Sequence, residues 1–253
     1  MPNTTHTLDT ELATEHYAHL SEEGFTPDHI WEMEQAGVKS LSKIQSLKEG
    51  FKVWDADNNQ WVSSSGIKFP FTKTFAQIRC DNPPMRGTKP AKYLTPAKAS
   101  AEAMLPKGCQ VITEGAKDAW AGTLKGEIVT GCLAGVSHAS KALAPNNGLI
   151  ILFDSDGWKN PSVANDLIKA AHHCNGKIQL VPEIEQFPKG GLCEYFKSGY
   201  RKEDYEALLD GAMWPDKFLW EWAERLDKYP LKLRADCLRV IAKWAYLMGG
   251  VGA

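Results

Sequence analysis

The second half of the chain alternates between short apolar runs and amphipathic segments. Each apolar run is followed by a stretch whose apolar residues recur with the spacing of one helix face. The predicted strands cover residues 111–113, 127–132, 149–153 and 177–181, and the predicted helices cover residues 116–124, 137–143, 161–174 and 191–196. Apolar strands that alternate with helices indicate a parallel sheet covered by helices on both faces, so we expect an α/β fold.

The flanking regions show other patterns. The first fifty residues predict short helices, and apolar runs broken by Gly, Pro and Asn predict strands and loops up to about residue 106, so we expect a smaller α+β region here. Beyond residue 200 the pattern predicts helices only, including one with a regular apolar stripe. The stripe consists of Leu231, Ala235, Leu238, Ala242 and Ala245. We expect the helix with this stripe to pack against the α/β core. The three patterns divide the chain into predicted regions 1–106, 107–199 and 200–253.

Charge is distributed unevenly, although the whole chain carries a formal net charge of only −2. The first fifty residues hold nine acidic side chains against three lysines. Residues 67–107 instead hold eight Lys or Arg against Asp81 and Glu102, which gives this segment a net charge of +6. A local basic segment of this kind can bind the phosphates of nucleic acid, although the net charge of the whole chain gives no indication of such binding.

Several classes of protein are disfavoured. No apolar run approaches the roughly 18 residues of a membrane span, and the polar start lacks the apolar stretch of a secretory signal, so we expect a cytoplasmic protein without membrane contact. The six cysteines form no C-x-x-C pair, which argues against a zinc ribbon. The absence of a G-x-x-x-x-G-K-[ST] loop excludes a P-loop ATPase motor.

Three carboxylates follow predicted parallel strands. Glu114 comes directly after the strand 111–113, and Asp154 and Asp156 come after the strand 149–153. Because ligands bind beyond the carboxyl ends of strands in an open parallel sheet, these acids face one crevice. Two carboxylates at i and i+2 leaving an extended strand repel each other unless a cation or proton intervenes, and hard oxygen ligands favour magnesium. The alternative is an ordinary D-x-D turn in which an aspartate caps the next helix.

These motifs resemble a known family. The segments that carry the resemblance are Val111-Ile112-Thr113-Glu114-Gly115, Asp154-Ser155-Asp156 and Ala91-Lys92-Tyr93-Leu94-Thr95-Pro96. The first two are similar to the Toprim domain shared by primases, topoisomerases and some nucleases, and the third resembles the segment that precedes the acidic motif in bacterial and phage-type primases. The layout of the stretch from about Leu20 through Phe196 is similar to Toprim modules of plasmid and phage replication proteins, which are often joined to a helicase.

The resemblance implies a role for each acidic position. It makes 107–199 a Toprim catalytic domain, in which Glu114 acts as general acid or base or as a metal ligand, and Asp154 and Asp156 hold Mg²⁺ or Mn²⁺. Asp118 matches an acidic position often seen four residues after the glutamate in primases. Lys117 matches a basic choice of the plasmid and phage group, and it either contacts phosphate or is a solvated helix residue.

Two features depart from the family pattern. Related modules often carry another aspartate in a K-G-x-D-like segment, where this chain has Cys193 followed by Glu194. Either Glu194 substitutes for that aspartate or the site has lost a ligand. Bacterial primases also carry an amino-terminal zinc domain that helps to choose the template site, and the cysteine spacing here provides none.

The basic segment supplies candidates for phosphate binding, namely Arg79, Lys89 and Lys92. Nearby aromatic residues are candidate base-stacking platforms, with core packing as the alternative. They are Phe69, Phe71, Phe75 and Tyr93. His138 is a further phosphate candidate at a predicted helix start, although capping by Ser137 also explains that position.

The leading functional hypothesis is a DNA primase or primase-like nucleotidyltransferase that makes short primers from nucleoside triphosphates on single-stranded DNA. The alternatives are a Toprim nuclease, in which the same cluster activates water, and a non-catalytic DNA-binding module that recruits a replicative helicase. The sequence leaves open whether the product is RNA or DNA, which template is preferred, whether a helicase is fused or separate, and the oligomeric state.

Overall fold

A computed structural model describes residues 11–249 apart from 98, 101, 136 and 138, and the chain divides into two compact units, 1–100 and 101–253. The side chains of residues 140 and 141 are also not described. Lys98 of the basic segment and the phosphate candidate His138 therefore lie outside the described residues.

The first unit is built on an antiparallel sheet with the strand order β1-β4-β5-β8. Its strands are β1 (Lys39–Leu41), β4 (Gly66–Pro70), β5 (Ala76–Cys80) and β8 (Tyr93–Leu94), and its helices are α1 (Thr14–Glu22), α2 (Pro27–Gln35) and α3 (Lys43–Lys48). Thr26 and Ser42 begin α2 and α3 as N-caps, because each hydroxyl accepts a bond from the backbone N–H three residues later. The core of the sheet includes the buried residues Phe51, Ile78 and Leu94.

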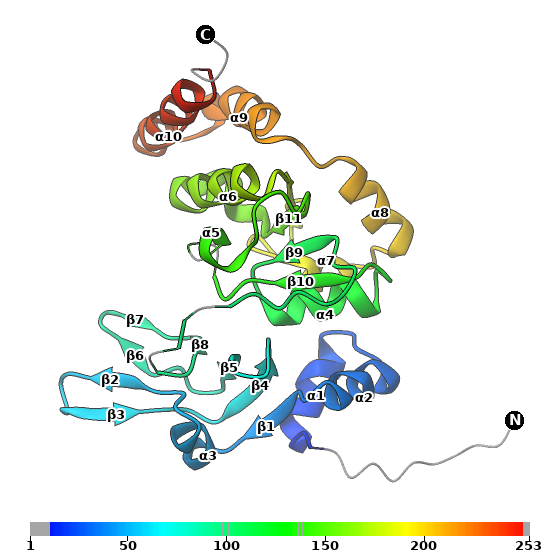
Figure 1. The fold of residues 1–253 in the computed structure, drawn as a ribbon, viewed down its shortest axis with the longest axis vertical. Coiled ribbons are helices and arrows are strands. Elements are labelled where there is room, and N and C mark those ends of the chain that lie inside the picture. The colour runs from blue at the N-terminus through cyan, green and yellow to red at the C-terminus, as the bar shows by residue number, and fades with distance from the viewer. Residues whose placement is uncertain (1–10, 98, 101, 136, 138, 250–253) are drawn as a thin grey trace, which may run out of the picture. The chain divides into compact units, whose positions relative to one another are not determined.

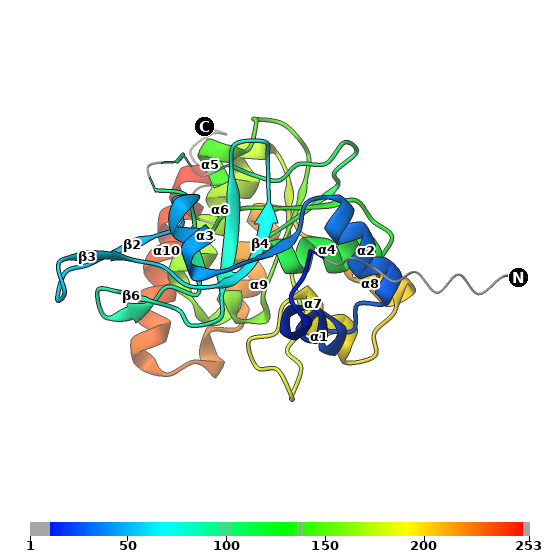
Figure 2. The same ribbon diagram turned by 90° about the horizontal axis from the view of Figure 1, so that it is seen from below.

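Two small hairpins complete this unit (Figure 1). One joins β2 (Val53–Asp55) to β3 (Gln60–Val62), and the other joins β6 (Met85–Arg86) to β7 (Lys89–Pro90). In the view of Figure 2, the β2–β3 hairpin extends away from strand β4 of the same unit. The predicted strands and loops between residues 51 and 106 therefore correspond to one short sheet and two hairpins.

The second unit is an α/β fold, as the sequence predicts. Its four-stranded sheet is fully parallel, with the order β10-β9-β11-β12. The strands are β9 (Val111–Thr113), β10 (Thr130–Cys132), β11 (Ile150–Phe153) and β12 (Lys177–Leu180). Strand β10 is shorter than the predicted 127–132, because Glu127 has a φ of 54°, a left-handed conformation that does not fit an extended strand. This order makes β9 and β11 central neighbours, although about forty residues separate them in the chain.

Helices cover both faces of this sheet (Figure 1). On one face α4 (Ala116–Leu124) packs with α7 (Leu192–Lys197), and on the other α5 (Ala139–Ala142) packs with α6 (Pro161–Cys174). Helix α6 begins where the sequence predicts, since the Asn160 side chain accepts a bond from the N–H of Val163 and Pro161 occupies the first turn. The face covered by α5 and α6 forms one large buried core together with residues from beyond position 210.

The region after residue 200 is helical, as expected, but the predicted core stripe is wrong. The elements are α8 (Lys202–Asp210), α9 (Pro215–Glu224), the 3-10 helix η3 (Leu226–Lys228) and α10 (Leu231–Gly249). Helices α9 and α10 pack on α6. Leu231 and Leu238 of the predicted stripe are 80% and 47% exposed, whereas Cys237 and Trp244 are buried. The neighbouring face is buried instead because its larger side chains remove more apolar area from water than alanines would.

We expect Trp244→Ala to destabilise the chain far more than Leu238→Ala. Trp244 is buried, and its Nε1 donates a hydrogen bond to Asn165 Oδ1 at 3.0 Å. Removal of a buried tryptophan costs about 3–5 kcal/mol, whereas an exposed substitution changes stability by about 0.5 kcal/mol. Chemical denaturation of both variants tests this, and equal losses would show that the exposed stripe is buried in solution.

Candidate catalytic site

The sheet order brings the two acidic motifs together. Strands β9 and β11 are hydrogen-bonded neighbours that run in the same direction, with Ile112 opposite Ile151. Glu114 follows β9 and Asp154 follows β11, so both carboxylates leave the sheet at the carboxyl edge of two adjacent strands. This edge is where ligands bind in open α/β sheets.

The D-x-D motif does not continue the extended strand. Asp154 directly follows β11, and Asp156 lies in the 3-10 helix η2 (Ser155–Lys159). Ser155 between them is fully buried, and it is tied to the next loop because its N–H donates to Gly190 O and its hydroxyl to Pro188 O, both at 3.3 Å. Asp154 makes no side-chain cap on η2, and Asn160 caps α6, so the ordinary helix-cap interpretation is disfavoured.

Asp118 belongs to the same site. It lies one helical turn beyond Glu114 on α4, and its Oδ1 accepts a hydrogen bond from the N–H of Cys193 at 2.9 Å. A Cβ added at Gly191 would lie 2.7 Å from Asp154 Oδ1 and 2.9 Å from Asp118 Oδ1. The two carboxylates therefore lie against the same bare backbone, which only a glycine leaves open.

Burial and mutual repulsion raise the pKa values of two of these acids. Burial raises the pKa of Asp154 to about 8, and the charges of Asp118, Glu114, Asp156 and Glu194 add to this effect. The pKa of Glu114 is also raised, first by desolvation among surrounding protein atoms and then by Asp118 and Asp156, although its side chain remains accessible. The site thus concentrates negative charge that a proton or a cation would neutralise.

Glu194 is engaged by other groups. Its Oε2 accepts a hydrogen bond from the N–H of Gly191 at 2.9 Å, which begins α7, and its Oε1 lies 3.4 Å from Lys117 Nζ. The side chain of Lys117 is only 11% exposed, so Lys117 is not the solvated helix residue that was one of its two interpretations. A phosphate contact by Lys117 stays a prediction.

Lys189 is a cation near the site that the sequence did not single out. Its Nζ lies 3.6 Å from Asp156 Oδ2, and its side chain is 80% exposed. Such a side chain moves freely, so the ion pair contributes little stability, but the ammonium group can reach an anion at the crevice. The sequence feature that could have identified Lys189 is its position in the K-G-G loop, to which the buried Ser155 is hydrogen-bonded.

The donor chemistry of the site fits magnesium. Within the described part of the chain, no three His, Cys, Asp or Glu side chains form a ready metal cage. Magnesium does not require one, because it takes one or two carboxylates and completes its shell with waters and substrate phosphates. The oxygen-only donors and the bare Gly191 backbone beside Asp154 and Asp118 suit such an open site.

Three of the predicted phosphate contacts belong to the first unit. Lys89 lies on β7 and is exposed, as is Lys92, whereas Arg79 lies on β5 and donates from Nη1 to His19 Nε2 at 2.8 Å. The phenylalanines pack in the core, which was the alternative to base stacking, since all of them are buried. Phe69, Phe71 and Phe75 are part of the core, and Tyr93 is half-buried.

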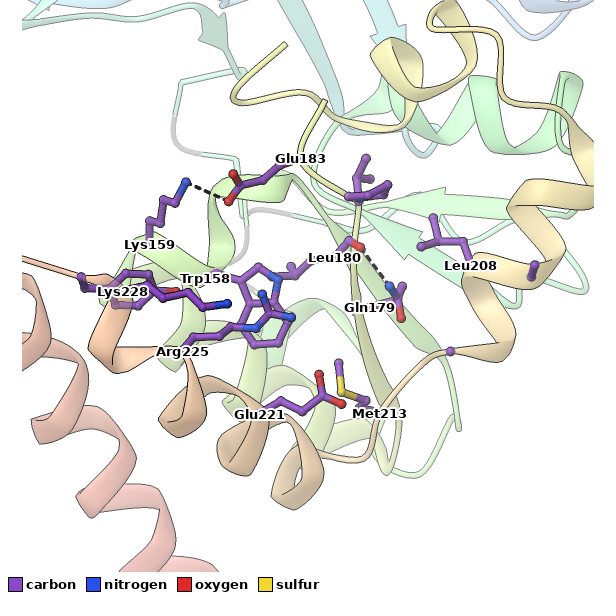
Figure 3. A pocket seen from close by; sticks show the side chains of 15 residues that line it. Trp158, Lys159, Gln179, Leu180, Glu183, Leu208, Met213, Glu221, Arg225 and Lys228 are labelled. Atoms are coloured by element: carbon purple, nitrogen blue, oxygen red, sulfur yellow. Dashed lines mark hydrogen bonds and ion pairs between the residues drawn. The ribbon is translucent and has the colours of Figure 1, made fainter. Parts of the chain in front are cut away.

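The second unit also contains a separate cavity of about 730 Å³ beside the edge strand β12 (Figure 3). None of the acidic residues of the candidate site lines it. One face of its Trp158 stacks on Phe218 at a centroid distance of 4.6 Å, and the Arg225 guanidinium lies 4.3 Å from the centroid of the same ring. Because Trp158 is already engaged by both partners, we assign no base-stacking role to this cavity.

Comparison with known proteins supports the fold. No family model matches the chain, and no curated protein matches it in sequence. The DnaG catalytic core matches with a TM-score of 0.54 and 16% identity over 91% of this chain and 84% of that chain. The DnaG primase catalytic domain bound to ssDNA gives 0.52 and 15% over 91% of both chains, and the E. coli primase catalytic core gives 0.52 and 16% over 87% and 84%. The chain therefore has the α/β fold of primase catalytic cores. None of its described helices combines the length and apolar character needed to cross a membrane.

The raised pKa of Asp154 predicts a pH-dependent stability difference between the wild type and Asp154→Asn. An unfolded aspartate loses its proton near pH 3.9, whereas folded Asp154 retains its proton up to about pH 8. Between these values the folded wild type binds more protons than the unfolded chain, so its stability falls as the pH rises. Asp154→Asn has no carboxyl group to titrate at this position, so it does not lose stability in this way. Its stability relative to the wild type should therefore increase from pH 5 to pH 8.

Chemical denaturation in a chelator at several pH values measures this difference. Asp210→Asn, an exposed position on α8, serves as the matched control and should follow the wild type. Magnesium should stabilise the wild type more at pH 8 than at pH 5, because carboxylate ligands must be deprotonated. A wild type to Asp154→Asn difference that does not change with pH would contradict the assigned pKa.

We expect Gly191→Ala to weaken metal binding while Gly115→Ala does not. The added methyl at Gly191 would collide with Asp154 and Asp118, whereas a Cβ at Gly115 would lie at an ordinary 3.5 Å from Asp118 Oδ2. Overpacking of this kind costs about 1–3 kcal/mol, which corresponds to about a tenfold loss of affinity or more. Calorimetric titration with Mn²⁺ provides the measurement, and equal affinities for the two variants would refute the steric argument.

Proposed function

We propose that this chain is a Toprim-type primase-like nucleotidyltransferase, which joins nucleoside triphosphates into short primers on single-stranded DNA in plasmid or phage replication. One observation carries the proposal. Glu114, Asp118, Asp154 and Asp156 gather at the carboxyl edge of two adjacent parallel strands, in a fold shared with primase catalytic cores. One of the matching catalytic domains was solved with single-stranded DNA. On this basis 107–199 is the catalytic domain, between the regions 1–106 and 200–253.

Each acid has a distinct proposed role. Asp154 and Asp156 would hold Mg²⁺, with Mn²⁺ as a substitute, and Asp118 lies beside Asp154 as a further oxygen donor. When bound, the metal neutralises negative charge on the triphosphate. Glu114 would accept the proton of the attacking 3′-hydroxyl, since its raised pKa brings the carboxylate closer to the range in which a general base works at neutral pH.

Cationic side chains would bind the phosphates. Lys189, exposed and 3.6 Å from Asp156, is placed to meet the triphosphate at the same crevice. Lys117 would contribute from α4 if a phosphate replaced its partner Glu194. Arg79, Lys89 and Lys92 of the first unit would hold the template, and a replicative helicase, fused or separate, would be the protein partner.

The test is a primer-synthesis assay with single-stranded DNA, labelled ribonucleotides or deoxyribonucleotides, and magnesium. The wild type should make short oligonucleotides, and Asp154→Ala with Asp156→Ala should reduce their yield by about a hundredfold or more, because charge stabilisation worth several kcal/mol is lost. The matched control is Asp210→Ala with Asp216→Ala, which removes two exposed aspartates from α8 and α9.

Three outcomes contradict the proposal in different ways. Primer synthesis that survives the double substitution would show that the assigned carboxylates are not the site. Cleavage of labelled DNA with metal and without nucleotides would identify a nuclease instead. DNA binding by the wild type without any product would indicate a non-catalytic replication module.

A further inference from the structure

The two hairpins of the first unit form a paired projection. Strand β2 packs beside β6, so the β2–β3 and β6–β7 hairpins lie side by side, as both ribbon views show (Figures 1 and 2). We call residues 52–62 and 85–90 together the hairpin arm. A cavity of about 520 Å³ lies against both hairpins, and its lining includes Asp55, Asp57 and Asn58 of one hairpin and Met85 of the other.

The outer face of the arm carries two tryptophans. Trp54 and Trp61 lie directly opposite each other in the β2–β3 register, with ring centroids 5.4 Å apart and ring planes at 72°. They are 44% and 47% exposed, whereas their neighbours Val53 and Val62 turn inward, buried and half-buried. Because side chains alternate along a strand, inward valines oblige both indoles to face the solvent.

Stability of the hairpin alone does not account for this pair. A cross-strand aromatic pair stabilises a hairpin to a small extent, and any β-branched pair would serve nearly as well at less cost in exposed apolar area. Two adjacent indoles that keep close to half of their surface in water form an exposed aromatic pair, and tryptophan is enriched at interaction sites. Their ligand must therefore offer flat apolar faces.

The hairpin arm also carries three cationic side chains. Lys52 Nζ lies 4.8 Å from the centroid of the Trp61 ring, and Arg86 and Lys89 face each other across the β6–β7 pair, both exposed. Neither Arg86 nor Lys89 forms an ion pair with any residue that the structure describes. Asp55, the acid nearest the tryptophans in sequence, is occupied by the turn, since it accepts bonds from the N–H groups of Asp57 and Asn58.

We propose that the hairpin arm binds single-stranded nucleic acid, with bases stacked on Trp54 and Trp61 and backbone phosphates held by Lys52, Arg86 and Lys89. Aromatic rings beside cations are how proteins hold single strands without sequence preference. A duplex cannot use the indoles, because its base faces are already stacked. The binding does not depend on nucleotidyl transfer, and only the identity of the strand as a template rests on the proposed function.

The first test measures anisotropy of a fluorescently labelled oligo-dT with the full chain. Trp54→Val with Trp61→Val keeps the β-propensity of the hairpin and removes both indoles, and it should weaken binding about tenfold or more. Trp54→Phe with Trp61→Phe should bind between the two. Trp220→Leu, which removes a tryptophan that is 74% exposed on α9, is the matched control and should bind as the wild type does.

The second test separates stacking from charge through salt dependence. Lys52→Gln with Arg86→Gln should lower the slope of log affinity against log salt by about 0.7 for each lost phosphate contact. The valine variant should bind oligo-dT more weakly, with the same salt slope as the wild type. An oligonucleotide made of abasic sites should bind the valine variant and the wild type equally tightly. Lys217→Gln, an exposed lysine on α9, is the charge control.

The outcomes distinguish this proposal from the proposed function. The proposed role of the hairpin arm would be overturned if the wild type and the valine variant bound oligo-dT equally, with circular dichroism showing both folded. Duplex DNA competing as well as oligo-dT would overturn it too. If the arm binds as expected but no primers form, only the proposed function fails. If Asp154→Ala with Asp156→Ala abolishes synthesis and keeps full oligo-dT affinity, both stand.

Discussion

Repulsion between carboxylates at one edge of a parallel sheet is the constraint on which the second unit depends. Asp118 and Asp154 lie against the same glycine, and the charges of Glu114 and Asp156 act on Asp154 as well. Packing alone would separate such groups, because unpaired buried charge is costly. The backbone holds them instead, through the N–H of Cys193 bound to Asp118 and the buried Ser155 bound to the 188–190 loop. This concentration of negative charge is what the proposed metal site requires.

The loop between β12 and α7 is the second half of this arrangement. It supplies the bare backbone of Gly191, the acceptors for Ser155 and the exposed cation Lys189. Its residues lie more than thirty positions after the D-x-D motif, yet they determine how close Asp154 and Asp118 come. Substitutions in this loop therefore change how the acids are positioned without removing a carboxylate, which separates positioning effects from the loss of a ligand.

The sequence predicts the α/β region well and the surface poorly. Helices 116–124 and 161–174 begin and end as predicted, since their caps and apolar spacing are local signals, and the topology then forces Glu114 and Asp154 together. The stripe on α10 failed because a helix with apolar residues on two faces does not say which one meets the core. Asp118 came only from the resemblance, and Lys189 was missed, because the contacts of the 188–191 loop join residues far apart in the chain.

Position 193 bears on whether the departure from the family pattern removes a ligand. Cys193 is fully buried, its Sγ lies 3.7 Å from Lys117 O, and its N–H holds Asp118. Glu194, one place later, is committed to Lys117 and to the start of α7. Because Asp118 already lies beside Asp154, the metal site of the proposed function would take its additional oxygen donor from α4 rather than from the K-G-G loop. The loop would then contribute the backbone that positions this donor, so cysteine at 193 is compatible with the proposed site.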